Sequence, residues 1–243
     1  QDCAMANTDA AAALNARLCK LNAHPPSARG EFVLYWVASA RVRYNHALLY
    51  AVQRANSLGL PVVACYGLDA SFPGASARSF GFLVQGLAEM SDALRGLGIR
   101  SCAEANQPGT ARRSRFPRSR APRVAELIVR QSAPVPLVAA LTRRAALVVC
   151  EHAVTRVPRR WRAELGGVCG VECVSVETDT VVPIRLASTQ LEPTAASLRP
   201  KLKRLWPRFL RHDGSESPPV PTRTSLHLDL DTPPPPPPLP PPC

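Results

Sequence analysis

The sequence predicts an α/β fold: a Rossmann-like, doubly wound, five-stranded parallel sheet. Short apolar runs alternate along the chain with amphipathic segments of helical periodicity. The runs are apolar throughout, instead of apolar at every second residue. A strand of this kind must be covered on both faces, which is typical of a parallel sheet flanked by helices.

Five apolar runs are the predicted strands, because they are short and rich in β-branched residues. They are Phe32–Val37, Pro61–Tyr66, Leu127–Arg130, Ala145–Cys150 and Glu172–Val176. Helical periodicity is found over residues 45–58, 80–97, 136–144 and 158–165. Asn45 is suited to cap the first helix and Gly59 to end it. We place this unit between residues 30 and 186.

The remaining segments lack the pattern. Residues 1–29 are Ala-rich and are predicted to be a loose lead-in, whereas residues 101–124 are polar and are predicted to be an insertion. Residues 187–210 are interpreted as an interdomain linker. We expect residues 211–243 to be a disordered Pro-rich tail, which an SH3 or WW domain could bind as a polyproline II helix.

The net charge of +12 favours a nucleic-acid partner, but the charge is concentrated in one place. Six arginines lie within residues 112–123, where there is no acidic residue. Such a cluster is usually a solvated loop, and phosphate binding is the alternative.

The eight cysteines predict neither a disulfide framework nor a metal site. Cys65 and Cys150 end apolar runs, where a free thiol packs as a small hydrophobic group. Cys169 and Cys173 are further apart than the usual C-x-x-C pair of a zinc site. A reduced chain indicates an intracellular location, and we expect the nucleus or an organelle such as the chloroplast or mitochondrion.

No catalytic motif is present in the sequence. The glycines form neither G-x-G-x-x-G nor G-x-x-x-x-G-K, and the histidines are not arranged around a nucleophile. A doubly wound sheet binds its ligand at the carboxyl ends of the strands, where the strand order reverses. The residue pattern alone therefore predicts an α/β domain with an unidentified ligand and no catalytic residue.

Six motifs resemble those of class II DNA photolyases, which repair cyclobutane pyrimidine dimers. They are Val33–Trp36 (YVLYW in the family), Asn45–Pro61 (NHAL.YA..RAN.LGLP), Arg78–Leu87 (R.F.FML.GL), the strand Ala145–Cys150, Pro158–Arg162 (R.WR) and Val181–Lys201 (VVPV..AS…LRPKI). The resemblance covers about residues 30–100 and 127–210, with the motifs in the family's order. Residues 101–124 have no counterpart in the family.

This resemblance implies the N-terminal α/β domain of a light-driven enzyme that repairs UV-damaged DNA. In the family, reduced FAD in a separate helical domain gives an electron to the flipped-out dimer. The α/β domain holds at most an antenna chromophore, such as a deazaflavin. We expect this chain to be truncated before the FAD-binding domain and to be inactive alone.

An antenna pocket is expected between the first strand and the strand that ends at Cys150, since the strand order should reverse there. The candidate binding residues are Trp36, Ser39, Arg41, Leu68, Cys150, Glu151 and Arg156. For Trp36, Trp161 and Trp206, packing in the core is the expected role.

Two other classes of function remain open from the sequence. A stand-alone α/β module that binds a chromophore or nucleotide would be stabilised by its ligand. An interaction protein that works through the proline tail would bind SH3 or WW domains, and truncation after Leu210 would abolish that binding.

Overall fold

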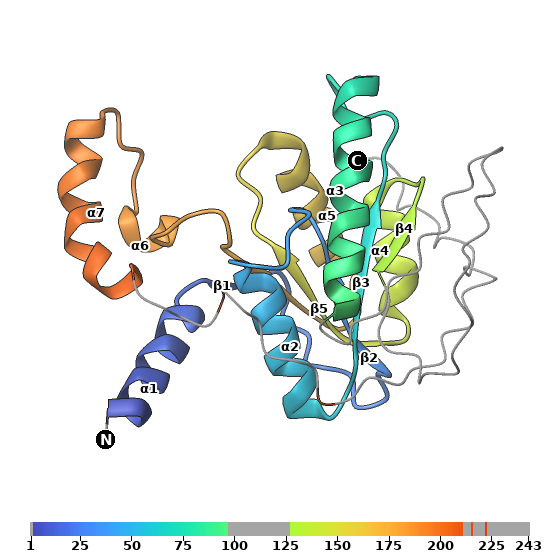
Figure 1. Cartoon of the computed structure of the whole chain (residues 1–243), viewed down its shortest axis with the longest axis horizontal. Helices are drawn as coiled ribbons and strands as arrows, with labels where there is room; N and C mark the ends of the chain where they lie inside the picture. Colours follow the sequence, from blue (N-terminus) through green and yellow to red (C-terminus); the bar gives the residue numbers. More distant parts are fainter. Residues whose placement is uncertain (1, 97–126, 211–214, 216–221, 223–243) are drawn as a thin grey trace.

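A computed structural model describes residues 2–96, 127–210, 215 and 222. Its sheet has six strands in the order β1-β6-β5-β2-β3-β4 (Figure 1). The strands are β1 (Leu18–Lys20), β2 (Phe32–Trp36), β3 (Val62–Gly67), β4 (Leu127–Arg130), β5 (Ala145–Glu151) and β6 (Glu172–Val176). The helices are α1 (Asp2–Asn15), α2 (His46–Leu58), α3 (Ala77–Gly96), α4 (Pro134–Thr142), α5 (Arg156–Val168), α6 (Ile184–Ala187) and α7 (Ala195–Phe209).

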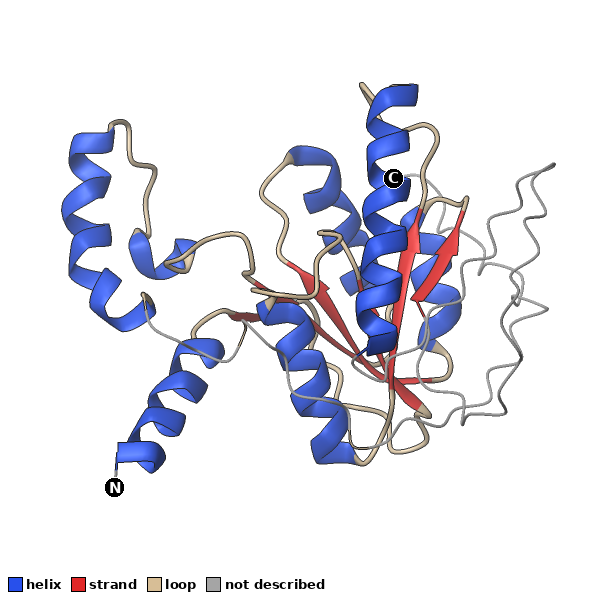
Figure 2. Cartoon of the chain, in the orientation of Figure 1, coloured by secondary structure: helices blue, strands red, loops and turns tan. Residues whose placement is uncertain are grey.

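The predicted doubly wound fold is confirmed. Strands β2 to β6 pair in parallel, and helices cover both faces of the sheet (Figure 2). Alternate residues of β2 belong to two separate cores, as a period of two requires. Val33 and Tyr35 pack with α2 and the second half of α3. Phe32 and Leu34 pack on the other face with α4 and α5.

The local signals at α2 are also confirmed. The side chain of Asn45 accepts a hydrogen bond from the backbone N–H of Leu48 at 2.9 Å, which caps the helix start. Gly59 follows the last turn with φ of 65°, a left-handed conformation that glycine adopts without strain. The cap and the stop therefore fix both ends of the helix that follows β2.

The sheet has a sixth strand that the sequence analysis missed. β1 is only three residues long and pairs antiparallel with β6 at one edge of the sheet. Such a short edge strand leaves no periodic signal, and its residues are partly exposed.

The prediction that residues 1–29 are a loose lead-in is wrong, because this region contains a helix as well as β1. It forms α1 because alanine has the highest helix propensity. The helix is held by Ala13, which packs with Val182 and Phe209. Just after it, the buried guanidinium of Arg17 donates to the carbonyl oxygens of Thr180 and Val181.

The segment interpreted as a linker, residues 187–210, is mostly helical. α7 begins after Thr194, whose hydroxyl accepts from the N–H of Ser197. The predicted insertion at residues 101–124 lies outside the described residues, as does the predicted tail apart from residues 215 and 222. In the described part of the chain, no helix is both long and apolar enough to cross a membrane.

Candidate functional site

The strand order reverses at β2. From β2 the chain moves outward to β3 and β4, then crosses back through α4 to β5 on the opposite side of β2. The carboxyl ends of β2 and β5 are therefore neighbours, with Trp36 opposite Cys150. This is the edge where a doubly wound sheet binds its ligand.

The last residue of β5 is Glu151, whose side chain is buried at this edge and only 1% exposed. Its carboxylate accepts hydrogen bonds from the Tyr35 hydroxyl at 2.6 Å and from the backbone N–H groups of Ala38 and Ser39 at 2.9 and 3.0 Å. Asn45 in turn donates to the Tyr35 oxygen at 2.8 Å. Burial, and then the charge of Glu151, raises the pKa of Tyr35 well above its usual value.

The cavity lies one strand further along, at the carboxyl ends of β2 and β3. It has a volume of about 400 Å³, within the range of small-molecule sites. Its walls come from β2, β3 and the loop after β3, and from the first parts of α3, α4 and α5. The lining residues are Trp36, Val37, Ala38, Tyr66, Gly67, Asp69, Phe72, Pro73, Gly74, Ala75, Ser79, Phe80, Leu83, Pro134, Pro158, Trp161 and Arg162.

Five of the residues that line the cavity are aromatic. Phe72 and Trp161 both line it and pack against each other, with ring centroids 5.8 Å apart and planes inclined by 57°. Phe80 from α3 and Tyr66 from β3 add two more rings. Walls of this kind favour flat aromatic ligands, which stack against rings on several sides.

Arg162 is a buried charged residue at the cavity and is 6% exposed. Its guanidinium lies over the Trp36 ring, 3.7 Å from the centroid. Nε donates to the backbone carbonyl of Glu151 at 2.9 Å. Nη1 is buried and has no hydrogen-bond partner among the described residues. The arginine is thus held firmly in place while part of its hydrogen-bonding capacity stays unused.

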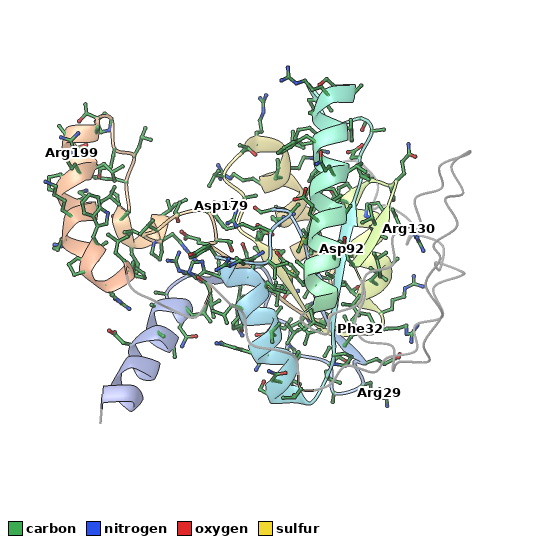
Figure 3. The ribbon with its side chains drawn as sticks, in the orientation of Figure 1. Arg29, Phe32, Asp92, Arg130, Asp179 and Arg199 are labelled. Carbon is green, nitrogen blue, oxygen red and sulfur yellow. The ribbon has the colours of Figure 1, made fainter. Side chains whose placement is uncertain are left out.

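The binding residues predicted from the sequence do not lie together in the structure. Trp36 lines the cavity, and Leu68 lies between two lining residues without lining it itself. Ser39 belongs to the Glu151 network, and Arg41 pairs at 2.8 Å with Asp179. Asp179 lies in the loop after β6 and is labelled in Figure 3. The cavity thus lies one strand away from the position expected from the sequence, where Glu151 and its hydrogen-bond donors lie.

The last two candidates lie away from the cavity. Cys150 is buried in the core below the sheet edge, and Arg156 is the exposed first residue of α5. Sequence reasoning missed Phe72, Trp161 and Arg162. The last two stand in the R.WR motif, which was used only as a sign of family resemblance.

The buried cysteines are part of the core. Burial raises the pKa of the Cys65 thiol to about 12, so this thiol stays protonated and inert. Cys173 lies beside Cys150 and Cys169, and its thiol lowers the pKa of the Cys169 thiol below its usual value. Among the residues that the structure describes, no group of three or more His, Cys, Asp or Glu side chains could hold a metal ion.

Comparison with known proteins supports the resemblance found in the motifs. The family model described as DNA photolyase matches residues 33–112. A deoxyribodipyrimidine photo-lyase from Methanothermobacter thermautotrophicus is 31% identical over 195 residues, which cover 80% of this chain and 38% of that protein. One from Arabidopsis thaliana is 26% identical over 198 residues, covering 80% of this chain and 35% of that protein.

Among solved structures, a universal stress protein from Archaeoglobus fulgidus aligns with a TM-score of 0.35 and 16% identity, over 58% of this chain and 91% of that chain. That likeness is too weak to say anything about function. The sequence matches are much stronger, although the chain spans little more than a third of the photo-lyases it matches. Together with the parallel sheet, they identify the α/β unit of this chain as an N-terminal domain of the DNA photolyase family.

Proposed function

We propose that residues 30–186 form the light-harvesting domain of a class II photolyase that repairs cyclobutane pyrimidine dimers, in the nucleus or an organelle. Residues 187–210 then connect this domain to a flavin-binding helical domain. The whole enzyme acts on UV-damaged DNA, and the α/β domain supplies excitation energy. The cavity beside Arg162 is the single observation that carries the proposal, since a light-harvesting domain must hold a chromophore.

The residues present fit an antenna chromophore such as a deazaflavin. The volume of about 400 Å³ suits a tricyclic ring system, and aromatic side chains border it on several sides. Phe72 and Trp161 pack against each other, and the ring surfaces that they leave toward the cavity can stack on a flat chromophore. Arg162 lines the same cavity and adds a positive charge to its wall.

When bound, the chromophore would absorb light and pass its excitation to the flavin. The residues of this chain have the simpler task of binding and orientation. The rigid edge of the parallel sheet holds Trp36 and Tyr66, while α5 supplies Trp161 and Arg162 from one side. A fixed orientation matters because energy transfer depends on the angle between donor and acceptor.

The test begins with the cDNA that contains this chain. We expect it to continue into a flavin-binding domain, and the complete protein to repair dimers with an action spectrum that has an antenna band besides the flavin band. Leu83→Trp should fill the cavity from α3 and remove the antenna band, while repair driven by direct flavin absorption continues.

Phe82→Trp is the matched control, because Phe82 is the adjacent residue of α3, is 81% exposed and does not line the cavity. It should keep the antenna band. A transcript without a flavin domain, or an antenna band that survives Leu83→Trp, would overturn the proposal.

A further inference from the structure

Helix α7 has one apolar face and one basic face. Leu202, Leu205 and Phe209 recur at spacings of three and four and pack in one cluster with Ala13 of α1. Four exposed cations lie outside this apolar stripe, and we call them the α7 cations: Arg199, Lys203, Arg204 and Arg208. Arg199 lies on the side of α7 that faces away from the sheet (Figure 3).

The positive charge around α7 is not balanced by acidic residues. Residues 181–210 contain six Lys or Arg residues and a single acidic residue, Glu192. Glu192 pairs with Lys201, and Arg185 reaches Glu177 at 3.4 Å. Within the described ranges of the chain, none of the α7 cations forms an ion pair. Four exposed positive charges are therefore left without a carboxylate on one short helix.

The α7 cations also repel one another. Arg199 and Lys203 are four residues apart, as are Arg204 and Arg208, so the members of each pair lie one turn apart on the helix surface. Like charges at this spacing destabilise a helix. A helix face that is merely solvated usually alternates acidic and basic residues, which α7 does not. A bound polyanion would remove this repulsion.

We propose that the exposed face of α7 binds the phosphate backbone of duplex DNA through the α7 cations. The helix has 15 residues and is therefore about 22 Å long, enough to reach several phosphates of one strand. Lysine and arginine contacts to phosphate position a protein on DNA without reading the bases. Binding at α7 is accordingly independent of base sequence and of damage.

The inference rests on the proposed function for the identity of the polyanion, and it adds a DNA-binding surface to this chain. The family resemblance places the flipped-out dimer in the helical domain. α7 lies in the segment proposed to lead into that domain, so a duplex held at α7 would be anchored beside the dimer site, not within it. The α7 cations are then positioning residues for DNA.

The alternative is that the basic face is only solvated. In that case the loss of the α7 cations would weaken DNA binding no more than the loss of four positive charges elsewhere on the surface. The six arginines of residues 112–123 are a second possible contact with phosphate. They are retained in every variant below, so their contribution is the same throughout.

The experiment measures binding of the full chain to a fluorescein-labelled, undamaged duplex by fluorescence anisotropy, at salt concentrations from about 50 to 200 mM. The α7 variant combines Arg199→Gln, Lys203→Gln, Arg204→Gln and Arg208→Gln. The control variant loses the same net charge from exposed arginines that are spread over the chain, by Arg29→Gln, Arg78→Gln, Arg143→Gln and Arg160→Gln. Circular dichroism and a thermal melt confirm that each variant is folded.

Each lost phosphate contact lowers the slope of log K against log salt concentration by about 0.9 in magnitude. We expect the α7 variant to lower it by about 3 and to bind more than about tenfold more weakly at about 100 mM salt. Arg204→Gln alone should lower the slope by about 1. The control variant should change it by less than about 1.

An equal change of slope in the α7 and control variants would overturn the proposal, because net charge alone would then explain binding. A wild-type chain that does not bind the duplex, or an α7 variant that binds as tightly as the wild type, would also overturn it. The assay needs neither light nor flavin. DNA binding at α7 can therefore fail while the antenna proposal stands, and the reverse.

Discussion

The carboxyl edge of the sheet has two flanks that handle a buried charge in opposite ways. Between β5 and β2, Glu151 is fully enclosed, and its carboxylate accepts from Tyr35, Ala38 and Ser39. Beside the cavity at the ends of β2 and β3, Arg162 of α5 is almost as buried, yet its Nη1 has no hydrogen-bond partner in the described structure.

The difference between Glu151 and Arg162 distinguishes a residue that stabilises the fold from one that is available for function. A buried polar group whose partners all come from its own chain stabilises the fold and has nothing left for a ligand. A buried group with unused capacity lowers stability unless something else binds to it. The Glu151 network should therefore matter most for folding, and the cavity flank most for binding.

The largest expected change in the free energy of unfolding comes from a substitution of Glu151, on the flank between β5 and β2. Glu151→Ala leaves a buried tyrosine hydroxyl and two N–H groups without their acceptor, so the free energy of unfolding should fall by about 4 kcal/mol. Urea denaturation measures this change. Glu151→Gln keeps one carbonyl acceptor and should lose much less. A loss below about 1 kcal/mol in the alanine variant would contradict the structural role of the network.

On the cavity flank, a substitution should lower the free energy of unfolding most at Gly67, the last residue of β3. A Cβ atom at this position would lie 2.7 Å from Cα of Pro134, the first residue of α4. Because the clash is with backbone, α4 must shift, and Gly67→Ala should cost about 2 kcal/mol in urea denaturation. An unchanged unfolding midpoint would show that the end of β3 and the start of α4 do not approach this closely.

A glycine-to-alanine substitution in the first part of α3, which forms one cavity wall, should instead stabilise the protein. A Cβ atom at Gly81 would meet nothing within 4 Å, so Gly81→Ala gains helix propensity without a clash. We expect the free energy of unfolding to rise by about 0.7 kcal/mol. A loss of stability in the same assay would mean that this wall packs more tightly than the structure indicates.

The smallest effect is a pH dependence at His152, which follows Glu151 directly in the sequence. Partial burial lowers the pKa of its imidazole below the usual 6.5, although the charge of Glu177 opposes the shift. The unfolded chain then binds a proton more readily than the folded chain does. Stability from this residue is complete above pH 6.5 and is lost as the pH falls below it.

His152→Gln cannot titrate, so it should flatten the decline of the unfolding free energy below pH 6.5. The comparison is made by urea titrations at several pH values, with the wild-type chain in parallel. The same slope in both proteins would assign the pH dependence to other groups.

Much of the fold could be predicted because local rules determine it. The apolar runs gave five strands within about one residue of their observed ends, and Asn45 and Gly59 marked the limits of α2. β1 could not be predicted, since three partly exposed residues become a strand only through their pairing with β6. α1 was missed although its alanines favour a helix.

The candidate site was predicted less well, for a physical reason. The reversal of strand order at β2 followed from the sequence, but whether Glu151 is free depends on Tyr35, more than a hundred residues away in the chain. Arg162 looks no different in sequence from its neighbours Arg159 and Arg160. Only the fold makes it the buried one.

The most direct test of the contrast between the two flanks is the free energy of unfolding of Arg162→Met, measured in urea without ligand. Methionine retains contact with Trp36 and removes a buried charge, while one hydrogen bond to the Glu151 carbonyl is lost. We predict a value within about 1 kcal/mol of the wild type, or above it. A loss of about 4 kcal/mol, equal to that expected for Glu151→Ala, would contradict the account and make Arg162 a structural residue.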